Sequence, residues 1–296
     1  MADGARSSSA EILLYHTPGY FVNRKNAQNF KKNFPKFVQL FTCFSVWSMV
    51  YFNYSKGKKE VNKMTQKIDR RKHYIMMLDT ETCNILVDEK GQLDISSALV
   101  YDLGWKVIDK NGKVYEEKSY IVKEIFYGKS ELMQSAYYAK KIPMYLEQIK
   151  QGKRTVATFY EIRKDFIETM KKYATNTVCA HNAKFDYSVL NSTQKSLTKS
   201  KYCYFFPYGT EVWDTLKMAM DVVAKTPTYK AFCERNGYMT KNNQVRLTAE
   251  ILYRYISGNN DFIESHTGLE DVEIERQILA YCFRKHKAMR KTLWNN

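Results

Sequence analysis

Two hydrophobic patterns alternate along this chain from Tyr74 onward. Short, nearly continuous apolar runs are separated by longer segments in which apolar residues recur every three or four positions. The first pattern predicts strands and the second predicts amphipathic helices. Strands are expected at 74–78, 99–108, 113–122, 177–180 and 211–214. Helices are expected at 130–150 with a break at Pro143, and at 159–173, 186–200, 215–224, 247–256 and 269–287.

The order of these elements predicts an α/β fold. The segment Asp109-Lys110-Asn111-Gly112 separates the second and third strands, and Asn-Gly favours the left-handed backbone of a tight turn. These two strands are therefore expected to form an antiparallel hairpin. The later strands alternate with helices, which is typical of parallel pairing. We expect one mixed β-sheet, a hairpin plus parallel strands, flanked by helices.

The first 63 residues differ from the rest. They combine a Ser-rich start, basic patches and an uncharged run at 37–55. That run approaches the roughly 20 residues of a membrane span, but its polar side chains make a core or docking helix the favoured interpretation over an anchor. The codons of Lys59-Glu60-Val61 can contain a bacterial ribosome-binding sequence just before Met64. We hypothesise that Met64 is the natural start and 1–63 a leader, which mass spectrometry of the natural N-terminus would test.

Composition narrows the partners and the compartment. The formal net charge is +16 and 44% of residues are hydrophobic. A basic chain favours polyanions such as nucleic acid or an anionic membrane surface. The 6 cysteines are scattered without a CxxC pair, which argues against a disulfide framework or a zinc site. Reduced thiols indicate a cytoplasmic protein.

Acidic residues stand where buried apolar positions are expected. Asp79 and Glu81 follow the first strand and are two positions apart, so they project to the same side at its carboxyl end. Ligands of α/β sheets collect at such strand ends. Asp186 and Asp271 share their helix faces with apolar residues that should pack on the sheet. A buried carboxylate costs several kcal/mol unless it is paired or binds a metal.

A divalent metal site would account for this pattern. Hard cations such as Mg²⁺ and Mn²⁺ prefer oxygen ligands. Two ions about 3.5–4 Å apart stabilise both the attacking and the leaving oxygen of a phosphoryl displacement. His266 precedes Asp271 by five residues on a loop that contains Gly268, and an imidazole can accept a proton near neutral pH. Each motif alone has an ordinary structural interpretation; their order together predicts a nuclease.

The motifs resemble those of the DEDDh 3′→5′ exonucleases of the ribonuclease-H-like superfamily, over roughly residues 73–285. Three motifs carry the resemblance: Asp79-Thr80-Glu81, then Ala180-His181-Asn182-Ala183-Lys184-Phe185-Asp186, then His266 with Asp271. Between the second and third motifs, Trp213-Asp214-Thr215-Leu216 resembles a strand that the family has at this place. Cys83 and Asn84 stand where many members have Thr-Gly. The segment 124–150 also resembles exonuclease-like proteins of phages and prophages.

The resemblance implies roles for particular residues and an exonuclease domain over 64–296. Four carboxylates would bind two Mg²⁺ or Mn²⁺ ions: Asp79, Glu81, Asp186 and Asp271. His266 would be the general base. Thr80 and Asn182 would lie near the terminal nucleotide of the substrate. Phe185 would pack either against that nucleotide or within the protein. His181 and Asp214 are expected to support the fold.

We therefore predict a 3′→5′ exonuclease that releases nucleoside monophosphates from single-stranded DNA. Three alternatives remain open: an exoribonuclease that trims RNA 3′ ends, a catalytically silent nucleic-acid-binding module, and a protein tethered to a membrane by 37–55. A DNA polymerase or another replication protein is a candidate partner. The aromatic cluster at 202–208 could stack unpaired bases, but core and loop packing is the favoured interpretation.

Overall fold

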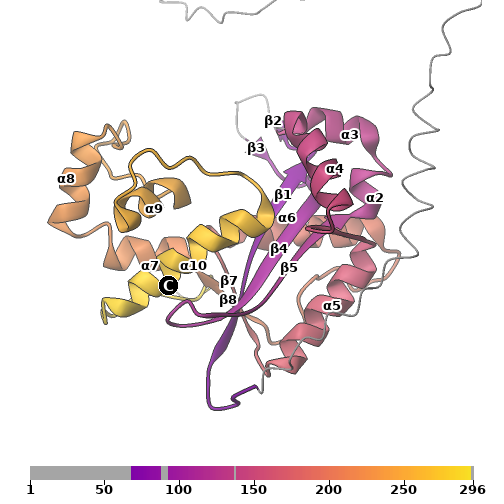
Figure 1. The fold of residues 1–296 in the computed structure, drawn as a ribbon, viewed down its shortest axis with the longest axis horizontal. Coiled ribbons are helices and arrows are strands. Elements are labelled where there is room, and N and C mark those ends of the chain that lie inside the picture. The colour runs from indigo at the N-terminus through magenta and orange to yellow at the C-terminus, as the bar shows by residue number, and fades with distance from the viewer. Residues whose placement is uncertain (1–67, 88–92, 137, 295–296) are drawn as a thin grey trace, which may run out of the picture. The chain divides into compact units, whose positions relative to one another are not determined.

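A six-stranded sheet forms the centre of the protein (Figure 1). The computed structural model describes residues 68–87, 93–136 and 138–294, so the expected N-terminal extension at 1–63, including 37–55, lies outside the described residues. The strands of this sheet are β1 (Tyr74–Cys83), β4 (Leu99–Asp109), β5 (Val114–Val122), β6 (Thr155–Ala157), β7 (Thr177–Ala180) and β8 (Glu211–Asp214). Two short strands, β2 (Leu86–Val87) and β3 (Leu93–Asp94), pair separately.

The sheet is mixed, with the order β6-β5-β4-β1-β7-β8. β4 pairs antiparallel with both β1 and β5, whereas β1 with β7, β7 with β8, and β5 with β6 are parallel pairs. The predicted mixed sheet, a hairpin plus parallel strands flanked by helices, is confirmed. The hairpin turn is held by the Asp109 carboxylate, whose Oδ1 accepts from the backbone N–H of Asn111 at 2.9 Å, and Gly112 adopts a φ of 79°.

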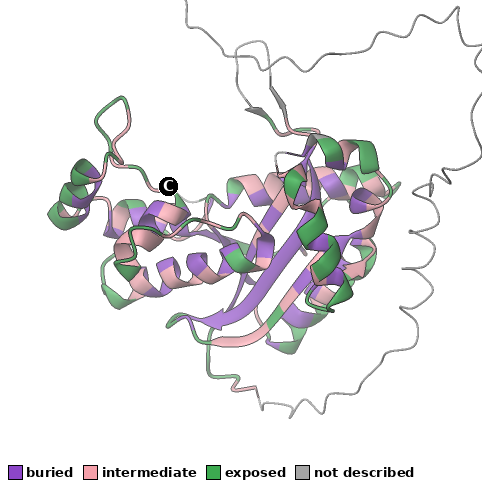
Figure 2. Cartoon of the chain, turned by 45° about the horizontal axis from the view of Figure 1, so that its top comes forward, coloured by how far each residue is buried: buried purple, intermediate pink, exposed green. Residues whose placement is uncertain are grey.

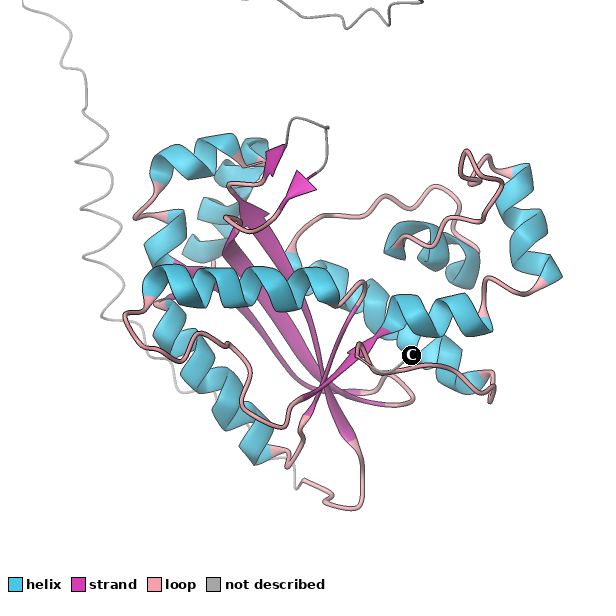
Figure 3. Ribbon diagram, turned by 180° about the vertical axis from the view of Figure 1, so that it is seen from behind, coloured by secondary structure: helices cyan, strands magenta, loops and turns pink. Residues whose placement is uncertain are grey.

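Helices cover both faces of the sheet. They are α2 (Lys123–Phe126), α3 (Ser130–Ser135), the 3₁₀ helix η2 (Ala139–Lys141), α4 (Ile142–Lys150), α5 (Phe159–Lys172), α6 (Lys184–Leu197), α7 (Thr215–Val222), α8 (Pro227–Arg235), α9 (Ala249–Ser257) and α10 (Gly268–Arg284). Figure 1 shows α7–α10 gathered to the left of the sheet and α2–α5 to its right. Figure 3, from behind, shows α6 crossing the strands. No helix among the described residues is both long and apolar enough to cross a membrane.

Alternating side chains of β1 enter two separate cores. Met76 and Leu78 pack with buried residues of α2–α6, while Ile75 and Met77 pack with those of α7–α10. Burying each of these side chains contributes about 1.5–3 kcal/mol. Figure 2 shows the buried residues running through the central strands and along the inner sides of the helices. β1 is therefore fixed from both faces, which suits a strand that carries the site residues.

Several elements differ from the sequence-based expectation. β1 was expected to end at Leu78, yet it continues to Cys83, because β4 supplies backbone partners as far as the pair Cys83 and Leu99. The helix expected at 130–150 is interrupted on the N-terminal side of Pro143 rather than at Pro143 itself, because the preceding residues form the separate helices α3 and η2. Pro143 lies in the first turn of α4, where its missing N–H costs nothing. The short strand β6 and helix α8 were not predicted.

Candidate active site

Asp79 and Glu81 lie within β1 and project toward α10. They continue the alternation of Ile75 and Met77, whose side chains belong to the core on that face. Glu81 pairs with Asp102 of β4, and the register shifts immediately afterward. Both acids are partly exposed, in contrast to the fully buried residues that precede them. The strand thus presents two carboxylates at the edge of its apolar segment.

The first turn of α10 lies directly on the backbone of β4 and β1. A Cβ atom at Gly104 would be 2.3 Å from the backbone nitrogen of Leu269, and one at Gly268 would be 2.9 Å from the backbone nitrogen of Gly104. Only glycines allow two main chains to approach so closely. This approach brings Asp271, in the first turn of α10, beside β1.

Glu81, His266 and Asp271 meet at this point. One ligand atom from each lies within 4.8 Å of the others. The Asp271 carboxylate is oriented by two further bonds, because it accepts from Ser265 Oγ at 3.0 Å and from the backbone N–H of Thr267 at 3.1 Å. Residues predicted from the first and third motifs are therefore brought together.

Asp186 reaches the same edge of the sheet from the opposite face. It lies in the first turn of α6 with only 3% of its surface exposed. Thr80, whose side chain points away from Asp79, donates from Oγ1 to Asp186 Oδ1 at 2.8 Å. Thr80 is itself buried, so its described contact is with Asp186, and contact with a nucleotide stays a prediction.

The four carboxylates act on one another electrostatically. Burial raises the pKa of Asp186 and of Asp271 to about 7. Burial also raises the pKa of Asp79 and of Glu81 well above the usual range, with neighbouring carboxylates adding to it, among them Asp186 and Asp271 on Asp79 and Asp271 on Glu81. A cluster of buried carboxylates is costly when its members are ionised, and a bound cation would lower that cost.

A fifth acid, Glu275, was missed from the sequence. It follows Asp271 by one turn of α10 and is 3% exposed, and its Oε2 has no hydrogen-bond partner among the described residues. Burial, then the charges of Asp186 and Asp271, raise its pKa well above the usual range. The signal available in the sequence was its position four residues after Asp271, on the same helix face.

These residues fit a divalent metal. The donors are mostly carboxylate oxygens, the ligands that Mg²⁺ and Mn²⁺ prefer. The cluster brings five carboxyl groups together, and Oε2 of Glu275 has no hydrogen-bond partner among the described residues. Glu81, His266 and Asp271 come close enough together to share one ion, and Asp79 and Asp186 lie within electrostatic range of this group; binding of metal by all four carboxylates stays a prediction.

His266 lies at the margin of the acid cluster. Burial, followed by the positive charge of Lys141, lowers the pKa of the imidazole, which keeps it neutral near pH 7. Its Nδ1 is 3.9 Å from Glu264 Oε2. Burial raises the pKa of Glu264 to about 8. A neutral imidazole is the form that can accept a proton.

Asn182 and Phe185 lie near Asp186 but contact the scaffold. Asn182 adopts a left-handed φ of 62°, and its backbone N–H donates to Asp214 Oδ1 at 3.0 Å. The same Asp214 oxygen caps α7 by accepting from Leu216 N at 2.9 Å. Phe185 is packed partly against the core. Asp214 supports the fold, and the substrate contacts of the other two stay predictions.

His181 is held within the scaffold, whereas the aromatic cluster at 202–208 is divided between the core and the surface. His181 Nδ1 is bonded to Thr215 Oγ1 at 2.9 Å and its Nε2 to the carbonyl of Leu247 at 2.7 Å, so both ring nitrogens have partners. In the cluster at 202–208, the two phenylalanines are buried, whereas its tyrosines are exposed.

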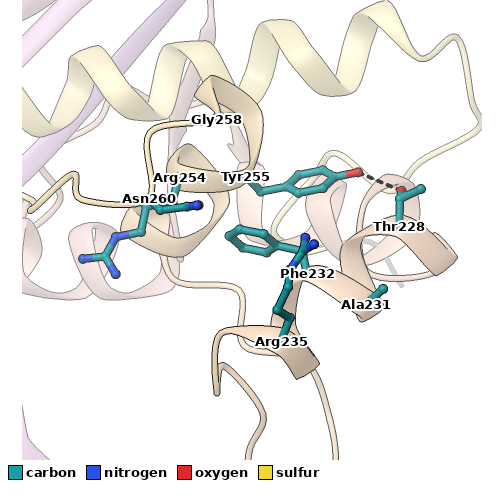
Figure 4. A pocket seen from close by; sticks show the side chains of 8 residues that line it. All are labelled: Thr228, Ala231, Phe232, Arg235, Arg254, Tyr255, Gly258 and Asn260. Atoms are coloured by element: carbon teal, nitrogen blue, oxygen red, sulfur yellow. Dashed lines mark hydrogen bonds between the residues drawn. The ribbon is translucent and has the colours of Figure 1, made fainter.

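A cavity of about 470 Å³ lies elsewhere, between α8 and α9 (Figure 4). Phe232 and Tyr255 line it beside Arg254. The Arg254 guanidinium already pairs with Glu250 at 2.7 Å and donates to the carbonyl of Phe262 at 2.7 Å. None of the described residues that line this cavity is acidic.

No protein-family profile and no curated protein matches this sequence. Among solved structures, the nuclease domain of 3′hExo, a DEDDh family member, bound to rAMP, is similar with 14% identity and a TM-score of 0.48, covering 75% of this chain and 98% of that one. A 3′-exonuclease that recognises the 3′ end of histone mRNA stem-loop is similar with 14% identity and a TM-score of 0.49 over 76% and 87%. S. pombe Pop2p in its Mg²⁺- and Mn²⁺-bound form has 13% identity and a TM-score of 0.40 over 71% and 82%.

Proposed function

We propose that this protein is a metal-dependent 3′→5′ exonuclease. The observation that carries the proposal is the meeting of Glu81, His266 and Asp271 within 4.8 Å, with Asp79 and Asp186 electrostatically coupled beside them. A carboxylate cluster with an adjacent neutral imidazole is suited to hydrolysis of an anionic ester. The net charge of +16 favours a nucleic-acid substrate over a neutral one.

The four carboxylates would hold two Mg²⁺ or Mn²⁺ ions. When bound, such ions act as Lewis acids that stabilise the negative charge developing on the phosphate. The protein contributes the arrangement of its ligands. The glycines Gly104 and Gly268 set the position of Asp271, and Thr80 orients Asp186.

His266 serves as the general base. Its neutral imidazole accepts a proton from the attacking water at a ring nitrogen. Water adds to the phosphorus of the terminal nucleotide while the bond from that phosphorus to the 3′ oxygen of the preceding nucleotide breaks. The departing 3′ oxygen takes up a proton from solvent, and the terminal nucleotide leaves as a nucleoside monophosphate. The lowered pKa of His266 keeps the accepting form dominant at neutral pH.

We propose single-stranded DNA as the substrate, which is also the substrate predicted from the sequence. Association with a polymerase, a cytoplasmic location and a phage origin stay predictions. RNA is the direct comparison, because a site that selects the sugar must contact the 2′-OH.

A labelled-oligonucleotide assay tests the function. Matched DNA and RNA single strands, labelled at the 5′ end, should shorten stepwise from the 3′ end in Mg²⁺ and stay intact in EDTA. Asp79→Ala and Asp186→Ala should abolish turnover, and His266→Ala should lower it by about 10²–10⁴-fold. Glu168→Ala is the matched control, because Glu168 is an exposed acid of α5 paired only loosely with Lys164 at 4.0 Å. Undiminished cleavage in EDTA would overturn the proposal.

A further inference from the structure

The helical segment between β5 and β6 reaches across to the loop that carries His266. Tyr138 immediately precedes η2, and Lys141 is the last residue of η2. The rings of Tyr138 and His266 are stacked, with centroids 4.6 Å apart and an interplanar angle of 15°. Lys141 Nζ donates to the carbonyl of His266 at 3.3 Å and to that of Ser265. Both contacts join residues about 125 positions apart in the sequence.

These contacts act on a strained part of the loop. His266 has a φ of 50°, a left-handed backbone that is uncommon for any residue other than glycine. Such a conformation persists only where surrounding groups hold it. Lys141 binds the carbonyls of Ser265 and His266, which lie on either side of the strained His266 backbone. The ammonium therefore holds the backbone of His266, while Tyr138 holds its imidazole ring.

A second network holds the loop just after His266. The backbone N–H of Gly268 donates to Asp102 Oδ2 at 3.0 Å. Asp102 is fully buried and pairs with Arg154 at 2.7 Å, and Arg154 also pairs with Glu270 at 2.6 Å. The chain is thereby anchored on the α10 side, and Lys141 and Tyr138 supply the matching anchor on the His266 side.

The charge of Lys141 also fits the cluster. Its ammonium lies close enough to Glu81 and Asp271 to stabilise their ionised forms electrostatically. It lies 4.3 Å from the centre of the Tyr138 ring, a favourable cation–π geometry. Lys141, Tyr138 and His266 thus form a continuous set of contacts beside two of the carboxylates.

We propose that Tyr138 and Lys141 are positioning residues that hold the His266 imidazole toward Glu81 and Asp271. The proposal rests on the proposed function, because it assigns His266 a catalytic task. Neither residue need touch the reacting atoms. Small displacements of a catalytic group can lower turnover by about 10²-fold, so loss of either contact should matter.

Paired substitutions, one that keeps each contact and one that removes it, distinguish a positioning role from a merely structural one. Tyr138→Leu removes the stacked ring and Tyr138→Phe keeps it; Lys141→Met removes the donor and Lys141→Arg keeps it. We expect Tyr138→Leu and Lys141→Met to lower kcat by about 10–100-fold with little change in KM, while the two conservative variants stay within a few-fold of the parent protein. Lys140→Met is the control, because Lys140 is exposed next to Lys141.

Coupling to His266 is the decisive kinetic result. In a His266→Ala background, Lys141→Met should cause a clearly smaller loss than in the parent protein, since there is no imidazole left to position and only its charge beside Glu81 and Asp271 is removed. Full additive losses would overturn the proposal, as would a raised KM with unchanged kcat, which would make Lys141 a phosphate-binding residue.

A readout that needs no activity keeps the proposal separate from the function. In the metal-free protein, the NMR signals of the His266 ring should carry a ring-current shift that Tyr138→Phe retains and Tyr138→Leu abolishes. Unchanged His266 signals in Tyr138→Leu would refute the positioning role whether or not the protein is a nuclease. A parent protein that shows the shift but cleaves no nucleic acid would refute the proposed function alone.

Discussion

Glu275 and Glu273 lie two residues apart on α10 yet experience opposite environments. Glu275 is buried with an unpartnered oxygen among other carboxylates. Glu273 accepts from Lys106 Nζ at 2.6 Å and from Arg276 Nε at 2.8 Å, and despite opposing burial these partners lower its pKa to about 2. The same side chain therefore opposes folding at one position and supports it at the other.

Glu275→Gln should stabilise the metal-free protein. The change keeps the size of the side chain and leaves no group to ionise. We expect the free energy of unfolding in EDTA at pH 8 to rise, because on folding Glu275 must either bury its charge or take up a proton, and glutamine does neither. Urea unfolding measures it. Glu273→Gln is the control with the opposite sign, and a less stable Glu275→Gln protein would contradict the account.

At the scale of single residues, the sequence identified candidate site residues by their type and their order along the chain. Asp79, Asp186 and Asp271 stood at apolar positions, and that conflict revealed them. Glu275 was overlooked, because an acid inside a helix with several charged neighbours is ordinary. Lys141 was overlooked as well, because its importance comes from a contact across 125 positions that no local pattern encodes.

At the scale of elements, the packing of α10 on β4 determines where Asp271 lies. Gly104→Ala places a Cβ atom 2.3 Å from the backbone of Leu269, where no side-chain rotation can relieve the clash. We expect α10 to shift, with a loss of stability of about 1–3 kcal/mol and a larger proportional loss of turnover. Thermal unfolding and the oligonucleotide assay measure the two effects.

Gly237→Ala is the comparison for that change. Gly237, which follows α8, has open space around its Cβ position but a φ of 73°, so alanine there introduces backbone strain outside α10 and β4. It should lower stability while leaving turnover per folded molecule unchanged. Equal activity of the Gly104→Ala protein and the parent would show that the glycine contact does not set the site.

The extent of the elements could be predicted only in part. The hairpin and the parallel strands followed from the Asn-Gly turn and from apolar runs. The extension of β1 through Asp79 and Glu81 did not, because it depends on backbone partners in β4 rather than on hydrophobicity. The three-residue strand β6 is likewise formed by its pairing with β5.

For the whole molecule, the acid cluster predicts an unusual dependence of stability on pH. Asp186 and Asp271 have ordinary pKa values of 3.8 and folded values of about 7. Between these values the unfolded chain is ionised while the folded protein retains the proton, so folding loses stability as pH rises. The loss is about 1.4 kcal/mol per pH unit for each group, and it is complete above about pH 7.

Thermal unfolding in EDTA from pH 5 to 8 measures this effect. The metal-free protein should be most stable near the acidic end, since ion-paired acids such as Glu273, with a pKa of about 2, lose their contribution only at lower pH. Saturating Mn²⁺ should abolish the decline, because a bound cation stabilises the ionised carboxylates. A metal-free protein that gains stability steadily from pH 5 to 8 would contradict the prediction.

The location of bound metal tests the central claim most directly. Crystals of the protein soaked in Mn²⁺ should give anomalous difference peaks bounded by Asp79, Glu81, Asp186 and Asp271, and the peaks should vanish in Asp186→Ala. His266 should lie beside them. Mn²⁺ bound only away from these four carboxylates, in a protein that still degrades nucleic acid, would contradict the account.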